Sequence, residues 1–419
     1  MTTSAEKTFT PYQGFIIAIL AILQFTIILD FMVLSPLSAI LLDEMHITTA
    51  QFGLVVSAYA FSAGASGLMA AGFADRFDRK KLLLFFYTGF IVGTFLCGIA
   101  PTYHLLLAAR IVTGLFGGVI GSIIYAIITD LFELKVRGRV MGFVQMAFAS
   151  SQVLGIPLGL YLANLWNWHA PFLLIVGVSI LVYIAILYSM KPVDEHLAYQ
   201  TKQSPFRHLS KTVSQVRYIK GFAATTLLAT GGFMLMPFGA AFSVNNLGIT
   251  LEELPLVYMV TGIVTMIGGP FLGKLTDRIG KMSMFVIGST LSLVLVLYYT
   301  NLGITPLWFL IVLNAVLFLG ITSRMISSSA LTTAVPEPAD RGAFMGVNAS
   351  VAQISGGIAS AVAGMIVYQN ETGHIERYPM LGIIVAVSMV ITMWMMHIIN
   401  KDIIRREQEK KEEEDTILV

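Results

Sequence analysis

The sequence of 419 residues has few charges, one cysteine and no clustered metal ligands. Only 12% of its residues are charged and 56% are hydrophobic, whereas soluble domains contain roughly 25% charged residues. The single cysteine, Cys97, excludes a disulfide framework and a thiolate metal cluster. Its seven histidines are scattered singly, so neither a metal site nor a cofactor is expected. The formal net charge of +2 gives no reason to expect a nucleic-acid partner. This composition is typical of a chain that lies in a lipid bilayer.

Twelve apolar runs are long enough to cross a bilayer, which takes about 20 residues per helix. They lie near residues 14–42, 50–74, 81–100, 103–131, 138–165, 169–190, 217–246, 252–275, 282–301, 305–333, 342–368 and 378–400. The first run is too long for the core of a signal peptide, so we expect it to be retained as a span. The sequence therefore predicts an all-α integral membrane protein. Its expected parts are a six-helix bundle over 1–190, a cytoplasmic linker over 191–216, a second bundle over 217–400 and a cytoplasmic tail over 401–419.

Basic residues gather on one side of this predicted topology. If the N-terminus is cytoplasmic, all but three of the 26 Lys and Arg residues face the cytoplasm. The exceptions are Arg377 in an external loop and Arg110 and Arg324 within spans. Because short loops rich in Lys and Arg stay in the cytoplasm, both termini are expected there, in a bacterial inner (plasma) membrane. The tail "RREQEKKEEEDTILV" is expected to be a solvated, frayed segment.

The two halves of the chain repeat each other at an offset of about 202 residues. The stretch "AGFADRFDRKK" is answered by "GKLTDRIGKM", which places Asp75 opposite Asp277. Likewise "GRVMG" at 138–142 is echoed by "GAFMG" at 342–346. Two parallel six-span repeats are known in one large class of transporters, which binds its substrate between the halves near the midplane.

The chain resembles the major facilitator superfamily, and within it the twelve-span drug:proton antiporter-like branch. The loop signature of that superfamily, G-x-L-x-D-R-x-G-R-K, is matched in the second half by Gly273, Leu275, Asp277, Arg278, Gly280 and Lys281. The first half matches it at Asp75, Arg76, Arg79 and Lys80, but has Ala71 and Asp78 where glycines are expected. Since aspartate tolerates a left-handed turn better than most residues, we expect the second replacement to be mild.

Three further stretches are similar to motifs of the antiporter branch. "LDFMVLSP" at 29–36 carries Asp30, and "RIVTG" at 110–114 begins with Arg110, whose counterpart in the family is associated with proton coupling. "SQVLGIPLG" at 151–159 is centred on Gly155 and Pro157 and is similar to a fifth-span motif typical of exporters, although Leu160 replaces its last glycine. We expect Gly155, Pro157 and Gly159 to bend this span near its external end, as a gate hinge or as a fixed kink.

Asp30 is the acid placed well inside a span, where an unpaired carboxylate is costly. It is either a proton carrier or a structural carboxylate permanently paired across helices. Arg110 is the obvious partner: it lies roughly 10 Å from the external end of its span, and Asp30 roughly 18 Å from the end of its own, a gap that a long arginine can close. In the resembled fold both spans line the central cavity, which implies one wet site. Protonated Asp30 would release Arg110, and deprotonated Asp30 would recapture it or accept a cationic substrate. The alternative for Arg110 is a static packing anchor.

Charged loop residues have a plain role as topological charge, and the resemblance adds a cytoplasmic latch that holds the two halves together. The residues concerned are Asp75, Arg76, Arg79, Asp277, Arg278 and Lys281.

Candidate substrate contacts are polar side chains that are costly to expose to lipid, and soft or aromatic ones around Pro237. They are Tyr125, Gln145, Gln152, Phe233, Met234, Phe238, Asn245, Tyr258, Asn314 and Arg324. The soft and aromatic side chains also suit a plain lipid-facing surface, which is the more common position for any one of them. Arg324 either binds an anionic group of a substrate or reaches toward the cytoplasmic face.

We therefore expect a proton-coupled secondary transporter: a monomeric antiporter that exports small amphipathic compounds by alternating access, with the proton as coupling ion. Arg324 leaves open a proton-linked uptake or exchange of a sugar, organic anion or other metabolite. A non-transporting membrane receptor or scaffold is a further alternative. An enzyme is not expected, because no nucleophile, metal or cofactor constellation appears.

Overall fold

The computed structural model describes residues 9–70, 76–195, 197, 215–337 and 340–417. Within these residues, twelve helical segments are long and apolar enough to span a membrane. The predicted all-α fold with twelve spans is confirmed. Asp75 and most of the predicted linker lie outside the described residues.

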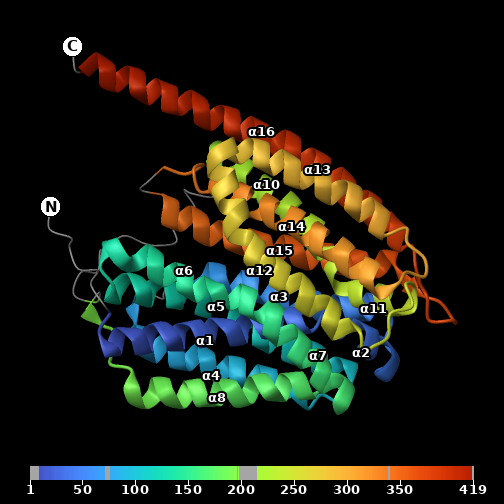
Figure 1. Cartoon of the computed structure of the whole chain (residues 1–419). Helices are drawn as coiled ribbons and strands as arrows, with labels where there is room; N and C mark the ends of the chain where they lie inside the picture. Colours follow the sequence, from blue (N-terminus) through green and yellow to red (C-terminus); the bar gives the residue numbers. More distant parts are fainter. Residues whose placement is uncertain (1–8, 71–75, 196, 198–214, 338–339, 418–419) are drawn as a thin grey trace.

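The first half of the chain forms one bundle and the second half forms another (Figure 1). The first contains α1 (Pro11–Val33), α2 (Ser38–Glu44), α3 (Thr49–Ala70), α4 (Arg79–Gly98), α5 (Tyr103–Leu131), α6 (Leu134–Ser150), a π-helical turn (Ser151–Gly155), α7 (Ile156–Leu165) and α8 (Ala170–Ser189). The second contains α10 (Val216–Phe233), a 3₁₀ turn (Met236–Phe238), α11 (Gly239–Asn245), α12 (Leu254–Ile279), α13 (Lys281–Tyr299), α14 (Leu307–Thr332), α15 (Arg341–Ile366), β1 (Tyr368–Gln369), β2 (Ile375–Glu376) and α16 (Tyr378–Ile417). The two short strands pair antiparallel as a hairpin.

Figure 1 shows that α1 begins and α16 ends at one end of the molecule, which we call the terminal side. The β1–β2 hairpin, α2 and α11 lie at the other end, which we call the hairpin side. All spans therefore run between two faces, as a bilayer requires.

The first apolar run is not one helix, as the sequence had suggested, because α1 ends at Val33 and α2 begins at Ser38. Pro36 causes the break, since it has no N–H to donate and its ring clashes with a continuing helix. The second half repeats this feature at Pro237, between α10 and α11. The two prolines are 201 residues apart, so the internal repeat extends to the helix breaks.

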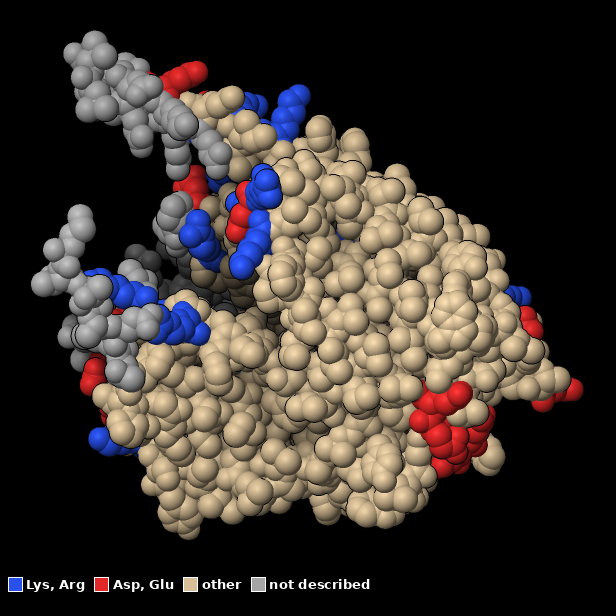
Figure 2. All heavy atoms as spheres, viewed as in Figure 1, with Lys and Arg blue, Asp and Glu red and all other residues tan. Residues whose placement is uncertain are grey.

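The two bundles touch closely on the hairpin side. Thr49 donates a hydrogen bond to the Val367 carbonyl at 2.6 Å, and the Asn164 amide donates to the Leu251 carbonyl at 2.7 Å. A side-chain bond joins Gln369 to Asp43 at 3.0 Å. On the terminal side, the surface is hollowed between the bundles (Figure 2). The structure thus represents a conformation that is closed on the hairpin side.

The charged tail is helical as far as Ile417, because α16 continues beyond the last apolar turn. The expectation of a frayed segment is therefore wrong for the described part of the tail. No glycine or proline interrupts this stretch, and Arg405 and Glu409, four residues apart, form an ion pair at 3.6 Å. Figure 1 shows this helix projecting past the rest of its bundle.

Candidate functional site

Asp30 and Arg110 form an ion pair inside the first bundle. The Asp30 carboxylate accepts a hydrogen bond from Arg110 Nη1 at 2.8 Å and another from the Thr94 hydroxyl at 3.1 Å. Arg110 Nη1 also donates to the backbone carbonyl of Asp30 at 3.3 Å. The two side chains are 0% and 1% exposed, so the pair is fully withdrawn from solvent. Three spans meet here, since α1, α5 and α4 supply Asp30, Arg110 and Thr94.

The break at Pro36 changes the depth estimated for Asp30 from the sequence. Asp30 lies in the last turn of α1 and not in the middle of a longer helix. Its distance to the end of its helix is therefore about 5 Å and not 18 Å. Arg110 lies about two turns into α5 from the same side, so a short reach suffices.

An aromatic ring completes the surroundings of the pair. The guanidinium carbon of Arg110 lies 4.5 Å from the centre of the Tyr59 ring, a cation–π contact. Arg110 Nε has no hydrogen-bond partner within the described residues. The sequence prediction included neither Tyr59 nor Thr94. Thr94 and Cys97 lie three residues apart on one buried face of α4, a polar pattern that could have identified this helix as the third partner.

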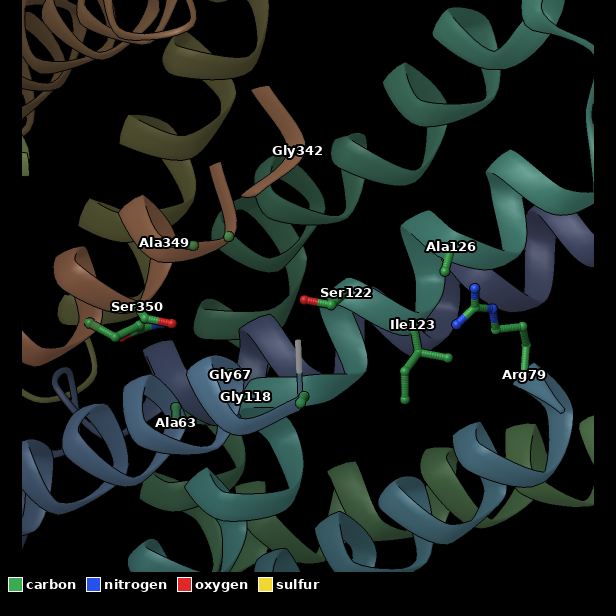
Figure 3. Close-up of a pocket in the computed structure, with 13 residues that line it drawn as sticks. Ala63, Gly67, Arg79, Gly118, Ser122, Ile123, Ala126, Gly342, Ala349 and Ser350 are labelled. Carbon is green, nitrogen blue, oxygen red and sulfur yellow. The ribbon is translucent and has the colours of Figure 1, made fainter. Parts of the chain in front are cut away.

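A cavity of about 310 Å³ lies between the bundles. It is lined from α3, α5 and α15 and their neighbours by Ala63, Gly67, Ala70, Arg79, Gly118, Ser122, Ile123, Ala126, Gly342, Gly346, Ala349, Ser350 and Gln353. Arg79 is the first residue of α4 and Gly342 the second of α15, so the cavity reaches the terminal side. Figure 3 shows Ser122 and Ser350 pointing into the space between α5 and α15. The walls are mostly glycine and alanine, and the polar side chains among them are Ser122, Ser350, Gln353 and Arg79.

The ion pair does not face this cavity in the structure. Tyr59 lies one helical turn beyond Ala63, at the level of the pair. Beside it, α3 and α5 touch, because a Cβ atom added at Gly114 would lie 2.5 Å from the Tyr59 carbonyl oxygen. The expected proximity of Asp30 and Arg110 is therefore found, but the expected wet site is not. Here the pair is buried within the first bundle.

None of the ten candidate substrate contacts is among the thirteen residues that line this cavity. Phe233 packs against Phe31 of the other bundle at 5.7 Å, and Phe238 is buried against Phe52 at 5.8 Å. The remaining placements are these: Met234 and Arg324 are buried, Tyr125, Gln152, Asn245, Tyr258 and Asn314 are half-buried, and Gln145 is exposed. Their contact with a substrate stays a prediction. Apart from Arg79, sequence reasoning missed the cavity walls because glycine, alanine and serine carry no chemical signature of a site.

The charged residues of the predicted latch differ in their surroundings. Arg79 Nε forms an ion pair with Asp130 at 3.1 Å, within the first bundle and at the cavity mouth. The others that the structure describes are exposed: Arg76, Asp277, Arg278 and Lys281. A latch between the halves stays a prediction.

Asp78 differs from the expectation of a left-handed turn. Its φ is −53°, and its carboxylate caps α4 by accepting a hydrogen bond from the Lys80 N–H at 2.8 Å. It accepts a second bond from the Val193 N–H at 3.1 Å. Gly280, which aligns with it in the second half, does adopt the left-handed conformation, with φ of +95°. The aspartate is therefore a helix cap and not a substitute for glycine.

The predicted bend in the fifth span coincides with the π-helical turn that ends at Gly155, two residues before Pro157. Proline cannot donate to the helical ladder, which accounts for the irregular turn. A Cβ atom added at Gly155 would lie 2.6 Å from the Leu29 side chain, and one at Gly159 would lie 3.0 Å from Val33. These glycines let the fifth span approach α1 beside Asp30. A role of this turn as a gate hinge or as a fixed kink stays a prediction.

Comparison with known proteins agrees with this architecture. The family model described as Major Facilitator Superfamily matches residues 20–360 and 221–417. The uncharacterized MFS-type transporter YceJ of Bacillus subtilis is 30% identical over 272 residues, which are 64% of this chain and 68% of that protein. Multidrug resistance protein 2 of Bacillus subtilis is 23% identical over 256 residues, which are 59% of this chain and 64% of that protein. A bacterial homologue of the human lysosomal transporter Spinster, solved inward-facing and unoccupied, shares the fold with a TM-score of 0.69 at 18% identity, over 94% of this chain and 96% of that one.

Proposed function

The chain belongs to the major facilitator superfamily, and from that premise we propose that it is a proton-coupled antiporter that exports small amphipathic compounds by alternating access. It is a multi-pass membrane protein and a secondary transporter, not an enzyme. Membership of a transporter family also sets aside the alternative of a receptor or scaffold. The coupling ion, the direction of transport and the substrate class are the proposal.

The observation that carries proton coupling is the buried pair of Asp30 and Arg110 at 2.8 Å. An arginine cannot give up its proton in a protein, so only the carboxylate can change its charge. Protonation of Asp30 removes the counter-charge and leaves the guanidinium with the Tyr59 ring and a backbone carbonyl. A buried, unpaired guanidinium is costly, so the protonated protein favours a conformation in which Arg110 is released. Proton uptake and conformation are thereby linked.

The proposed orientation of the molecule in the membrane is supported by its charges. Lys and Arg gather on the terminal side in Figure 2, and a group of Asp and Glu lies on the hairpin side. From the positive-inside rule we propose that the terminal side faces the cytoplasm, at the inner membrane of a bacterium. The cavity would admit substrate from the cytoplasm, and release would require the hairpin-side contacts to open while the terminal side closes.

Export is supported by the fifth-span stretch around Gly155 and Pro157 and by the resemblance to a multidrug resistance protein. A cavity lined mostly by small residues, with a few polar groups, suits loosely specific binding of amphipathic compounds. We propose that the transporter works as a monomer. A second candidate, proton-linked uptake or exchange of an organic anion, is favoured by the buried Arg324.

Replacing Asp30 by asparagine tests the proposal, because asparagine keeps the size of the side chain and cannot exchange a proton. A thermal-shift screen of purified protein at two pH values would first identify a fluorescent amphipathic substrate. In proteoliposomes, a pH gradient should then drive the wild type to accumulate this compound against its gradient. D30N should only equilibrate it. The matched control is Asp194→Asn, an exposed acid of the linker, which should behave as the wild type. Unchanged gradient-driven accumulation in D30N would refute the role of Asp30.

A further inference from the structure

Arg324 is a buried arginine that, unlike Arg110, forms no ion pair with an acid in the part of the chain that the structure describes. It lies in α14 and is only 4% exposed. Its Nε and Nη2 atoms have no hydrogen-bond partner within the described residues. Its guanidinium carbon lies 6.0 Å from the centre of the Phe285 ring, which is at the limit of a cation–π contact. Such a guanidinium in a membrane span marks a functional site by default.

The internal repeat shows what is missing beside it. Pro36 and Pro237 break equivalent spans at a spacing of 201 residues, and the same spacing places Gly231 at the position of Asp30. A Cβ atom added at Gly231 would lie 3.4 Å from Arg324 Nη1. In the second bundle the Arg324 guanidinium therefore lies beside Gly231, at the position where the first bundle has the carboxylate of Asp30.

Hydroxyl groups without partners gather around the same helix contact. Of twelve buried side-chain N and O atoms without a hydrogen bond in the described residues, five belong to Arg324, Ser289, Ser292 and Ser327. The three serines lie on the buried faces of α13 and α14, which pack against each other. Native proteins leave few buried polar groups unsatisfied, so this concentration calls for an explanation.

We propose that Arg324 binds the carboxylate of an amphipathic organic anion, with Gly231 leaving room for the carboxylate oxygens. A planar guanidinium matches a carboxylate through two parallel hydrogen bonds, and the nearby serines can donate more. The access of a ligand to Arg324 depends on α10. In this helix Phe233, two residues from Gly231, packs on Phe31 of the first bundle and on Gly356 of α15. A movement between the bundles therefore shifts the helix that covers Arg324. This proposal requires that the chain transports small molecules, but not that it couples to protons or exports.

A first experiment tests the missing counter-charge without any ligand. Gly231→Asp would place a carboxylate beside Arg324, and Gly231→Asn is the matched uncharged control. The added Cβ fits, because its nearest contacts are Arg324 Nη1 at 3.4 Å, Arg324 Nη2 at 3.8 Å and a Val385 methyl at 4.0 Å. We expect the aspartate variant to unfold several degrees higher than the asparagine variant, and the difference to disappear when Arg324→Gln is added. Equal midpoints for the two variants would overturn the proposal.

A second experiment tests ligand binding directly, with the full-length protein in detergent and no pH gradient. The probes are 4-phenylbutyrate, decanoate and 1-naphthylacetate, each compared with its primary amide. At least one carboxylate should bind the wild type about tenfold or more tightly than its amide, the difference expected for hydrogen bonds to a charged group. Arg324→Gln should abolish that preference, Arg324→Lys should retain part of it, and Gly231→Asp should remove it by occupying the guanidinium.

Three results of the binding experiment would contradict the proposal. One is that every carboxylate binds no better than its amide, and another is that the preference persists in the R324Q variant. The third is stabilisation by Gly231→Asp without any carboxylate preference, which would indicate that an acid of this chain serves Arg324 in another conformation. None of these readouts depends on transport, so a failure of proton coupling or export would leave them unchanged.

Discussion

A double-mutant cycle on Asp30 and Arg110 gives the sharpest energetic test of the buried pair. Removing one partner of a buried ion pair destabilises a protein by about 3–5 kcal/mol, because the other charge stays buried without compensation. For Asp30→Asn we expect about 3 kcal/mol, the lower end, because Arg110 keeps the Tyr59 ring and the backbone carbonyl of residue 30. For Arg110→Gln we expect about 4–5 kcal/mol, since Thr94 is the other side chain bonded to the carboxylate.

The double variant should be much less damaged than the sum of the two. With both charges removed, asparagine and glutamine can form a neutral hydrogen bond in the same space. The coupling energy should therefore be about 2–3 kcal/mol. Denaturant unfolding in mixed micelles measures it, with Thr94→Val as a control that removes one hydroxyl and is expected to cost about 1–2 kcal/mol.

Additive single effects would refute this reasoning. A coupling energy below about 0.5 kcal/mol is what distant, independent residues show. Such a result would mean that the 2.8 Å contact between the guanidinium and the carboxylate does not determine the stability of the first bundle. The mechanism by which protonation favours release of Arg110 would then have no energetic basis.

Two further predictions concern packing and gating. Gly114→Ala should destabilise the protein by about 1–3 kcal/mol, because its Cβ atom would lie 2.5 Å from the Tyr59 carbonyl oxygen. The control Gly121→Ala, whose Cβ atom would have nothing within 4 Å, should be nearly neutral. Equal unfolding midpoints for the two variants would contradict the close packing of α3 and α5. Asp75→Asn should weaken the predicted latch and shift the protein toward opening on the terminal side. A reporter Ser122→Cys in the cavity wall should then react faster with a membrane-impermeant maleimide. An equal labelling rate with and without the Asp75 substitution would count against the latch.

Features that depend on hydrophobic run length and charge were predictable from the sequence. The number of spans followed from twelve apolar runs, since each must satisfy its backbone within a helix. The contact between Asp30 and Arg110 followed from the cost of an isolated charge in a span. In both cases one strong physical constraint decides the outcome.

Features that depend on local backbone geometry or on the absence of side chains were not predictable in the same way. The break at Pro36 was hidden inside a long apolar run, although the proline itself was visible. Asp78 is a helix cap because its carboxylate accepts hydrogen bonds from two nearby backbone N–H groups. A comparison with a sequence motif does not reveal these contacts. The cavity walls consist mostly of small residues, whose contribution is the space that they leave between α3, α5 and α15.

The withdrawal of the pair from solvent was also not foreseen. The sequence suggested a wet site because both spans line the central cavity in the resembled fold. In the structure, Asp30 and Arg110 instead face α4, and Tyr59 lies near them at the level where α3 and α5 touch. Displacement of Tyr59 would therefore bring the ion pair closer to the cavity.

The central claim is that Asp30 takes up a proton during the transport cycle, and infrared difference spectroscopy tests it without knowledge of the substrate. Purified protein in nanodiscs would be cycled between neutral and acidic pH while the carbonyl stretch of protonated carboxylic acids is recorded. The account predicts a reversible band for a buried carboxylic acid in the wild type that is absent from Asp30→Asn and retained in Asp194→Asn. The same band in the D30N variant and in the wild type would show that another group is protonated, and would contradict the claim.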